Sequence, residues 1–315
     1  TSEVNHMTIG AGRVIFQDLV RINRDIESGE FYQNQEFLNA FKHAQKNKSK
    51  LHIKGLYSPG GVHSHQDHIK ALVKAAKDHG LTDNVYLHLM LDGRDTKPKS
   101  ALNYVEELQQ FLDEVGVGQI ASISGRYYAM DRDTNWDRTD LAFKALTKGE
   151  AKASYSSATK AIQANYDHDV TDEFIKPTLI KTEEEKPALI EDGDAVIFAN
   201  FRSDRPRQLV ERFQEKGPKN LYYVTMTQYN PDYDVHVAYP PVDVTMPLGQ
   251  VLAEANKKQL RITETEKFAH LTFFMNCKRE EPYPGEDRIM FDSNKDVKNH
   301  DEKPDTKMNP FIWYR

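Results

Sequence analysis

Lys50–Leu56 reads KLHIKGL, and the loop Gly60–His68 that soon follows reads GGVHSHQDH. The first run is short and apolar, which predicts a buried strand, and the amphipathic stretch His68–His79 predicts a helix. The same alternation then continues, with strands expected at Asn84–Leu91 and Ile120–Ser124 and a helix at Ser100–Val115, closed by Gly116. Strands that alternate with helices predict an α/β protein, with a mostly parallel sheet flanked by helices.

The second half of the chain continues the pattern up to a proline-rich segment. We expect helices at Trp136–Lys148, Ser157–Asp167 and Asp204–Phe213, strands at Ala195–Asn200 and Leu221–Met226, and a polar surface loop at Lys181–Lys186. The segment Tyr229–Pro247 contains four prolines and little periodicity, which predicts an extended crossing between two domains. Beyond it we expect a helix at Leu248–Asn256, strands at Gln259–Thr263 and Leu271–Phe274, and a poorly ordered tail at Asp292–Pro310.

Composition narrows the classes of function. The 315 residues are enough for two separate cores. The net charge of −6 provides no basic field, so we expect no nucleic-acid partner. The single cysteine, Cys277, cannot form an intramolecular disulfide, and no apolar run is long enough to span a bilayer. We expect a soluble cytoplasmic protein with no membrane partner, whose true start before Thr1 has been lost or removed.

Arginines form the first group of candidate binding residues, because they fall in loops after expected strands. They are Arg94, Arg126, Arg132, Arg202 and Arg205. Guanidinium groups bind phosphate and carboxylate through paired N–H bonds, so such a cluster suits a small phosphorylated anion. For any single arginine, an ion pair with a neighbouring aspartate is the alternative. Five arginines at strand ends favour the anion site.

The loop Gly60–His68 is the second candidate. Its glycines allow the backbone to approach a ligand, and the loop leads into a helix N-terminus that favours an anion. His63 could donate to a phosphate or protonate an oxygen. Two alternatives stay open: His63 and His65 could open a metal-dependent hydrolase site, with Asp92 and Asp95 as further ligands, or could be hydrogen-bonded structural groups.

Leu91–Asp95 reads LDGRD and places acids beside an arginine at a strand end. Asp95 next to Arg94 should be ionised, which suits a general base for a substrate hydroxyl. A simple loop salt bridge is the alternative. The adjacent phosphate site favours the general base.

Taken in order, these motifs resemble those of cofactor-independent phosphoglycerate mutases. The matching strings are Ser58–His65, Leu91–Asp95, Gly125–Arg138, Asn200–Arg205 and Glu264–His270, and the resemblance runs from Ser2 to about Val297. In that family a serine in an Asn-Ser-Glu-Val-Gly-His motif carries the phosphoryl group between the 2- and 3-hydroxyls of glycerate. The matching residues here are Thr1–His6, which implies that Ser2 is the nucleophile.

The resemblance also implies the roles of the other site residues. Asp95 would shuttle the hydroxyl proton, and Lys267 would offset charge on the transferring group. The residues implied to contact substrate are His63, Arg94, Asp95, Arg126, Arg132, Arg202, Arg205 and Lys267.

The chain departs from the family pattern in three places. The family's Leu-Asp-Gly-Trp-Gly type segment, with a metal-binding aspartate, would precede Thr1, and the part with ligands for two manganese ions would follow Val297. Asn5 and Thr1 replace a glycine and an asparagine of the family motif. We therefore expect a chain truncated at both ends, in which Ser2 is the remaining metal-contacting residue.

This comparison predicts four parts of the chain. Residues 1–16 would be a remnant of a metal-binding phosphatase-like domain, 17–240 the transferase domain that binds substrate, 241–297 a return into an incomplete alkaline-phosphatase-like α/β domain, and 298–315 a divergent tail. The expected function is the glycolytic interconversion of 3-phosphoglycerate and 2-phosphoglycerate by a monomer, without 2,3-bisphosphoglycerate and inactive alone. A non-catalytic phosphoglycerate-binding module and the metal-dependent hydrolase remain as alternatives.

Overall fold

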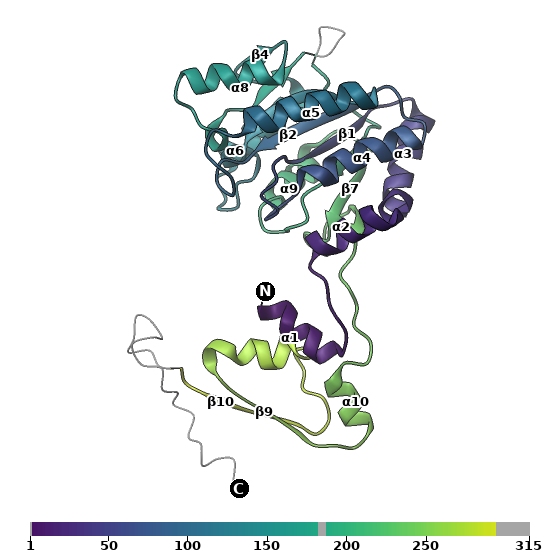
Figure 1. Ribbon diagram of the computed structural model, residues 1–315, viewed down its shortest axis with the longest axis vertical. Helices are drawn as coiled ribbons and strands as arrows, with labels where there is room; N and C mark the ends of the chain where they lie inside the picture. The colour runs from purple at the N-terminus through teal and green to yellow at the C-terminus, as the bar shows by residue number, and fades with distance from the viewer. Residues whose placement is uncertain (1, 182–186, 294–315) are drawn as a thin grey trace. The chain divides into compact units, whose positions relative to one another are not determined.

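The computed structural model describes residues 2–181 and 187–293, and the chain divides into two compact units (Figure 1). The larger unit is Asp18–Pro241, and the smaller unit combines Thr1–Gln17 with Val242–Arg315. Most of the expected polar loop at Lys181–Lys186 and of the expected tail at Asp292–Pro310 lies outside the described residues.

The larger unit is built on an eight-stranded sheet with the order β4-β5-β3-β2-β1-β6-β7-β8. The strands are β1 (Leu51–Leu56), β2 (Val85–Leu91), β3 (Gln119–Gly125), β4 (Ser154–Tyr155), β5 (Thr178–Ile180), β6 (Ala195–Phe198), β7 (Tyr222–Thr227) and β8 (His236–Tyr239). Neighbouring strands pair in parallel, except that β5 runs antiparallel to β3. The predicted α/β class with a mostly parallel sheet is confirmed.

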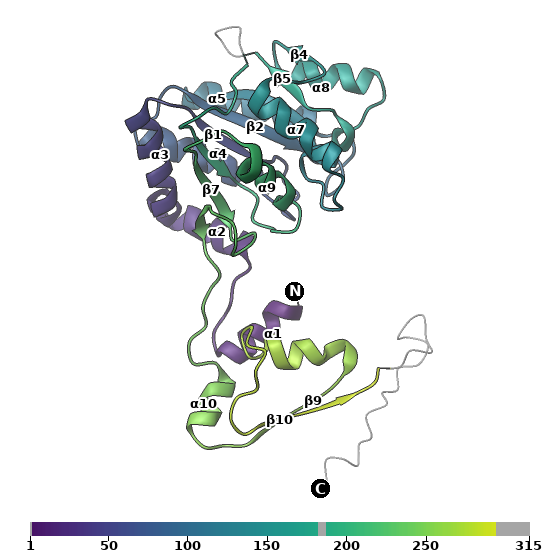
Figure 2. The same ribbon diagram turned by 180° about the vertical axis from the view of Figure 1, so that it is seen from behind.

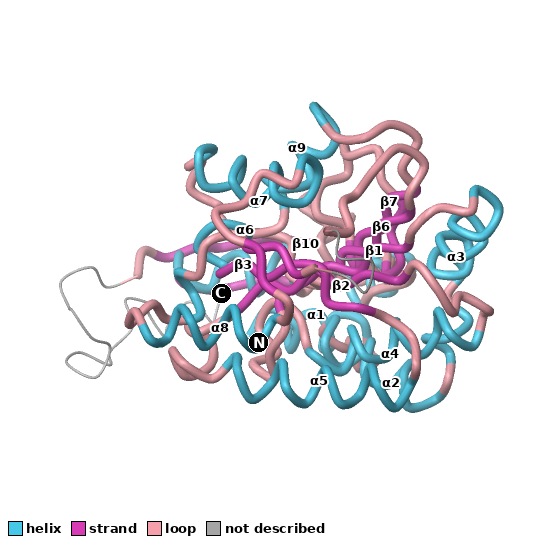
Figure 3. The backbone as a smooth tube through the Cα atoms, turned by 90° about the horizontal axis from the view of Figure 1, so that it is seen from above, coloured by secondary structure: helices cyan, strands magenta, loops and turns pink. Residues whose placement is uncertain are grey.

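Helices cover both faces of the sheet (Figures 1 and 2). Apolar residues of α2 (Asp18–Ser28), α3 (Gln35–Asn47), α4 (Gln66–Asp78), α5 (Ala101–Val115) and α8 (Ala158–Asp167) join one core. Those of α6 (Arg126–Ala129), α7 (Trp136–Lys148) and α9 (Arg207–Lys216) join a second core on the opposite face. Figure 3 shows the strands between these two helical layers.

Local sequence explains how α4 and α5 begin and end. His65 caps α4, because its Nδ1 accepts a hydrogen bond from the N–H of Asp67 at 3.3 Å. Ile69, Leu72 and Val73 then lie on one buried face, at helical spacing. As expected, α5 ends at Gly116, whose φ of 73° is a left-handed conformation that glycine adopts without steric cost.

Two expectations near the proline-rich segment are changed by the structure. The extended crossing expected at Tyr229–Pro247 contains β8, which pairs with β7 and buries Ala238 and Tyr239. The strand expected at Leu271–Phe274 is wrong, because residues His270–Phe274 form a helical turn, η4. The Thr272 hydroxyl donates to the Phe268 carbonyl, and the Met275 N–H donates to the His270 carbonyl, so local bonds replace a strand ladder.

The smaller unit contains short elements around a small core. They are α1 (Ser2–Ala11), α10 (Leu248–Glu254), β9 (Gln259–Glu264), η3 (Thr265–Lys267), η4 and β10 (Glu286–Phe291). The strands β9 and β10 pair in parallel, and Met7, Ile15 and Val244 form the core. Gly10 is required in α1, because a Cβ there would lie 1.8 Å from the Met275 carbonyl oxygen.

Candidate anion-binding site

Four neighbouring strands of the larger unit end at a group of charged side chains. Ser58 and His63 follow β1, Asp92 and Asp95 follow β2, Arg126 follows β3, and the segment Asn200–Arg205 follows β6. These strands are adjacent in the order β3-β2-β1-β6, so their carboxyl ends lie together at one edge of the sheet. Ligands of open α/β sheets bind at this edge.

Arg126 lies at the centre of the group and is almost fully buried, with 2% of its surface exposed. Its Nη1 donates to Asp92 Oδ1 at 2.7 Å and to Asp95 Oδ2 at 2.6 Å. Burial alone would lower the pKa of Arg126, but the hydrogen bonds that it donates to these carboxylates raise the pKa above its usual value. The guanidinium is therefore a permanent charge held in a fixed position.

Asp92 organises the loops on both sides of Arg126. Its Oδ2 accepts from the Ser58 hydroxyl at 2.6 Å, and its Oδ1 accepts from the Asp95 N–H at 3.0 Å. Burial would raise the pKa of Asp92, but these bonds and Arg126 outweigh it and hold the pKa below its usual range. Gly60 leaves room for this arrangement, because a Cβ there would lie 3.2 Å from Asp92 Oδ2.

Asp204 connects a second set of groups at the same strand ends. Its carboxylate pairs with Arg132 Nη1 at 2.7 Å and with Arg202 Nε at 3.1 Å. Its Oδ1 lies 3.6 Å from His63 Nδ1. Burial would raise the pKa of Asp204, but the bond from Arg132 and the charge of Arg202 lower it. The carboxylate therefore draws two arginines together.

His63 lies between the two sets of charges. Its Nε2 is 4.0 Å from Asp95 Oδ2, and its carbonyl accepts the N–H of Phe201 at 2.8 Å, which ties the β1 loop to the β6 loop. Burial, followed by the charge of Arg126, lowers the pKa of His63 to about 4. The imidazole is therefore neutral at pH 7 and can donate from one nitrogen and accept at the other.

The remaining predicted arginines border the same group. Arg205 Nη1 donates to the Met130 carbonyl at 3.2 Å, and its pKa is lowered by burial and then by the charges of Arg126, Arg132 and Arg94. This mutual repulsion shows that the guanidinium groups are close. Arg94 is more exposed, and its Nη1 lies 3.4 Å from Glu173 Oε1.

Three polar atoms in this group are buried and make no hydrogen bond in the described structure: His63 Nδ1, Arg126 Nε and Asp204 Oδ1. Asp204 Oδ1 has the ion pair with Arg202, but the two nitrogens have no acceptor within hydrogen-bond geometry. Buried donors without an acceptor are costly, so these nitrogens indicate a site that a ligand oxygen completes. The predicted residues His63, Arg94, Asp95, Arg126, Arg132, Arg202 and Arg205 are thus brought together in the larger unit.

Ser2 and Lys267 belong to the smaller unit. Ser2 is exposed and begins α1, and its carbonyl oxygen lies 2.8 Å from His6 Nδ1. Lys267 is exposed in η3. The His6 and His270 rings meet edge to face with centroids 5.3 Å apart, so the motifs around Ser2 and Lys267 are neighbours within this unit.

The residues that the structure describes do not bring together three histidine, cysteine, aspartate or glutamate side chains suited to hold a metal ion. Ser2 therefore has no matching set of ligands in that part of the chain, and His65 serves as the cap of α4. No helix within residues 2–181 and 187–293 is long and apolar enough to cross a membrane.

Sequence reasoning did not place Ser58, Asp204 and Glu173 at the site, and it considered Asp92 only as a possible metal ligand. Asp204 lies inside the motif Asn200–Arg205, so its spacing between Arg202 and Arg205 was a usable signal. Glu173 is far from Arg94 in sequence, and no local pattern indicates that pair.

Strand-end loops that carry five arginines, three aspartates and a neutral histidine define an α/β protein with a candidate anion-binding site. Residues 22–231 match the family model described as BPG-independent PGAM N-terminus (iPGM_N), where PGAM denotes phosphoglycerate mutase. The chain belongs to this family.

Individual relatives agree with the family match. The chain is 46% identical to 2,3-bisphosphoglycerate-independent phosphoglycerate mutase of Listeria welshimeri, and the match covers 96% of this chain and 61% of the relative. It is 50% identical to phosphoglycerate mutase 1 of the same type from Methanosarcina barkeri, with 96% and 60% covered. The chain thus spans about three fifths of the length of these curated relatives.

A solved structure has the same fold. The crystal structure of Leishmania mexicana phosphoglycerate mutase at low cobalt concentration superposes with a TM-score of 0.71 at 31% identity. The match covers 96% of this chain and 58% of that chain.

Proposed function

We propose that this chain binds 3-phosphoglycerate and 2-phosphoglycerate, and that it is the substrate-binding part of a phosphoglycerate mutase. The observation that carries the proposal is the group of arginines around His63, in which two buried nitrogens, His63 Nδ1 and Arg126 Nε, make no hydrogen bond. A phosphoglycerate carries a phosphate, a carboxylate and a hydroxyl, which are the groups that guanidinium forks and a neutral imidazole can bind.

Different residues of the larger unit would bind different groups of the substrate. Arg94, Arg126, Arg132, Arg202 and Arg205 would hold the phosphate and carboxylate, and His63 would donate to a substrate oxygen. Asp95 is 20% exposed, is paired with Arg126 and lies near His63, so it is placed to exchange a proton with the substrate hydroxyl. Binding would order Arg94 and Arg202, whose side chains are about half exposed.

Residues of the smaller unit would take part in phosphoryl transfer in the whole enzyme. Ser2 would accept the phosphoryl group from one glycerate hydroxyl and return it to the other, and Lys267 would offset its negative charge. Manganese, two ions in the complete enzyme, would be the metal. The described residues supply no ligand set for these ions. The expected setting is a cytoplasmic glycolytic monomer that acts without 2,3-bisphosphoglycerate.

Isothermal titration calorimetry with 3-phosphoglycerate tests the binding proposal. Arg202→Gln removes a half-exposed guanidinium and should weaken binding by about tenfold or more, the cost of one charge-assisted hydrogen bond. Arg212→Gln is the matched control, because Arg212 pairs with Asp140 and Glu215 outside the site. If the unsubstituted chain binds 3-phosphoglycerate, and Arg202→Gln and Arg126→Gln bind it equally well, the substrate assignment is refuted.

A non-catalytic phosphoglycerate-binding module is the second candidate. It is favoured by the missing ligand set among residues 2–181 and 187–293. Phosphorus NMR of the chain with 3-phosphoglycerate and added manganese separates the two: formation of 2-phosphoglycerate that stops in Ser2→Ala supports the mutase, and binding without conversion supports the module. If the unsubstituted chain binds zinc stoichiometrically, and His63→Ala and His65→Ala do not, the metal-dependent hydrolase is supported instead.

A further inference from the structure

A buried hydrogen-bond chain crosses four strands below the anion site. Asp194 Oδ2 lies 3.1 Å from His52 Nε2, His52 Nδ1 lies 2.8 Å from His88 Nε2, and His88 Nδ1 lies 2.8 Å from the Ser122 hydroxyl. All four side chains are at most 5% exposed. Asp194 directly precedes β6, and the other three lie on β1, β2 and β3, which are adjacent to β6 and to one another in the order β3-β2-β1-β6.

Only one arrangement of protons satisfies this chain with neutral histidines. Asp194 accepts, so His52 carries its proton on Nε2 and accepts at Nδ1. His88 must then donate from Nε2 to His52 and accept the Ser122 hydroxyl proton at Nδ1. Burial lowers the pKa of both histidines, so the neutral forms are the stable ones in the folded chain.

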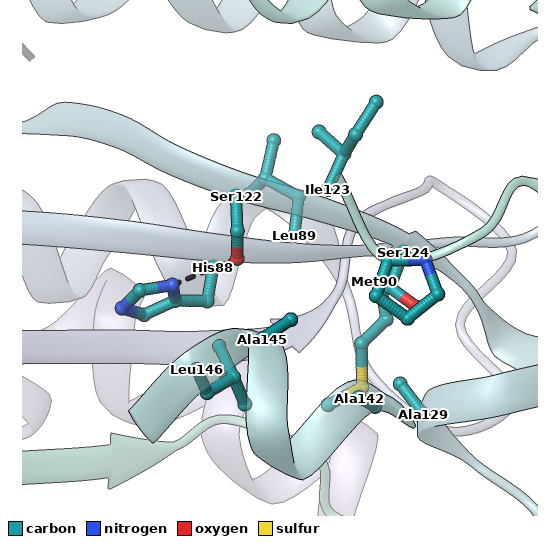
Figure 4. Close-up of a pocket in the computed structure, with 11 residues that line it drawn as sticks. His88, Leu89, Met90, Ser122, Ile123, Ser124, Ala129, Ala142, Ala145 and Leu146 are labelled. Carbon is teal, nitrogen blue, oxygen red and sulfur yellow. Dashed lines mark hydrogen bonds between the residues drawn. The ribbon is translucent and has the colours of Figure 1, made fainter. Parts of the chain in front are cut away.

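The last bond of the chain lies at an irregularity in the sheet. Leu87 pairs with Ile120, but the next residue, His88, pairs with Ser122, so β3 has one extra residue there. Such a β-bulge shifts every later residue of its strand relative to the neighbour. Figure 4 shows His88 and Ser122 joined at this point, close to Ala145 and Leu146 of α7.

The bulge determines where Arg126 lies. After it, Met90 pairs with Ser124 and Leu91 pairs with Gly125, so Arg126 follows level with Asp92. Without the extra residue, β3 would be displaced by one position, and a shift of one residue turns each side chain to the opposite face. The contact of Arg126 with Asp92 and Asp95 depends on this register.

We propose that the chain Asp194–His52–His88–Ser122 is a positioning device for the anion site, in which the His88–Ser122 bond holds the bulge that aligns Arg126 with Asp92. This hydrogen-bond chain does not touch substrate and acts through Arg126. This inference rests on the proposed function, because its effect is read as affinity for phosphoglycerate.

The test compares three variants on β3. Ser122→Ala removes the bond, Ser122→Thr keeps a hydroxyl, and Ser124→Ala makes the same change two residues nearer to Arg126 but outside the chain. Calorimetry should show that Ser122→Ala weakens 3-phosphoglycerate binding about three- to tenfold, the effect of one neutral hydrogen bond, while Ser122→Thr and Ser124→Ala bind like the unsubstituted protein. Urea unfolding checks that all three are folded.

A ligand-free readout separates this inference from the proposed function. Imidazole ¹⁵N shifts should show His88 protonated at Nε2 only, and the Arg126 Nε–H signal should move in Ser122→Ala and stay in Ser122→Thr. Normal affinity and an unmoved Arg126 signal in Ser122→Ala would overturn the positioning role. If the unsubstituted protein does not bind 3-phosphoglycerate, the proposed function fails. The Arg126 signal alone then decides whether the hydrogen-bond chain positions Arg126.

Discussion

At the scale of single residues, the site combines fixed charges with unpaired atoms. Arg126 is held by Asp92 and Asp95, whereas the second set of arginines, Arg132 and Arg202, meets at Asp204. A buried charge pair adds little net stability, but removing one partner leaves the other charge buried and unpaired. The carboxylates therefore keep the arginines in place before a ligand arrives.

Asp92→Ala should destabilise the larger unit by about 1–3 kcal/mol, because Arg126 keeps Asp95 but the Ser58 hydroxyl and the Asp95 N–H lose their acceptor. Urea unfolding measures the change. Glu215→Ala is the matched control: its half-exposed carboxylate pairs with Arg212 at 2.7 Å on a helix surface, and Arg212 keeps Asp140, so its loss should have little effect. Equal stability of the two variants would contradict the buried-pair account.

His63 should titrate with a pKa of about 4 in the free protein, because burial and Arg126 disfavour its charged form. Its pKa in the folded protein is below the value near 6.5 of the unfolded chain, so the unfolded chain takes up the proton at a higher pH than the folded protein. The contribution of His63 to stability is then lost as pH falls from about 6.5 towards 4. Proton NMR of the imidazole measures this, and a midpoint near 6.5 would show that the histidine is solvated.

The sequence predicted which residue types meet at the site better than it predicted their partners. Strand-end position identifies Arg126 and Arg202, because parallel strands share one edge. It does not indicate that Ser58 donates to Asp92 or that Glu173 approaches Arg94, since such pairs depend on rotamers and on loops far apart in sequence.

At the scale of elements, strands that are buried on both faces were the easiest to predict. The predicted strands around Leu51–Leu56, Val85–Leu91 and Gln119–Gly125 are confirmed within a residue or two. Short elements were missed: β8 is an edge strand beside prolines, and η4 has too few residues for its period to be distinguished from a strand. The bulge in β3 has no local sequence signal, because it depends on pairing with β2.

One face of the sheet buries a lysine without a hydrogen-bond partner. Lys54 Nζ lies 4.1 Å from the centroid of the Phe213 ring and 4.4 Å from that of Phe198. Burial lowers the pKa of Lys54 well below 10.5, so the amine is a poor fit to its surroundings when protonated. The unfolded chain holds this proton more tightly, which weakens folding below pH 10.5.

Lys54→Met should therefore stabilise the protein by about 1–3 kcal/mol at pH 7, the typical cost of an unpaired buried polar group. The gain should shrink as pH rises towards 10.5, because the unfolded chain then also loses the proton. Urea unfolding at pH 7 and pH 9 measures both effects, and Lys46→Met is the exposed control. A gain that is equal at both pH values would exclude titration of Lys54 as its cause.

Gly125 joins β3 to α6 at a crowded point. Its φ of −60° is open to any residue, but a Cβ would lie 2.1 Å from the Glu173 carbonyl oxygen. Gly125→Ala should cost about 2–3 kcal/mol through this clash, measured by thermal or urea unfolding. Gly116→Ala is the control, because its φ is positive but no atom lies near its Cβ, so its cost should be about 1 kcal/mol. The reverse order would argue against the close approach.

At the scale of the whole molecule, the two units differ in how their strands are buried. The sheet of the larger unit is covered by helices on both faces. In the smaller unit, β9 and β10 form a two-stranded parallel sheet, and Leu260 and Met290 are 51% and 53% exposed. Parallel pairs of this size are marginal without further packing.

Hydrogen exchange should therefore distinguish the units. Amides of β9 and β10 should exchange much faster than those of β1 and β2, because few buried contacts protect them. Mass spectrometry of peptides from each unit gives this comparison. Equal protection in β9 and β1 would mean that the smaller unit has a core of comparable stability.

The central claim is that a phosphoglycerate binds where β1, β2, β3 and β6 end. A titration of the ¹⁵N-labelled chain with 3-phosphoglycerate, followed by amide chemical shifts, tests it most directly. We predict saturable shifts in residues 58–68, 92–95, 125–132 and 200–205, with the start of β1 and the outer face of α5 unchanged. Saturable shifts confined to other parts of the chain, or none at all, would contradict the account.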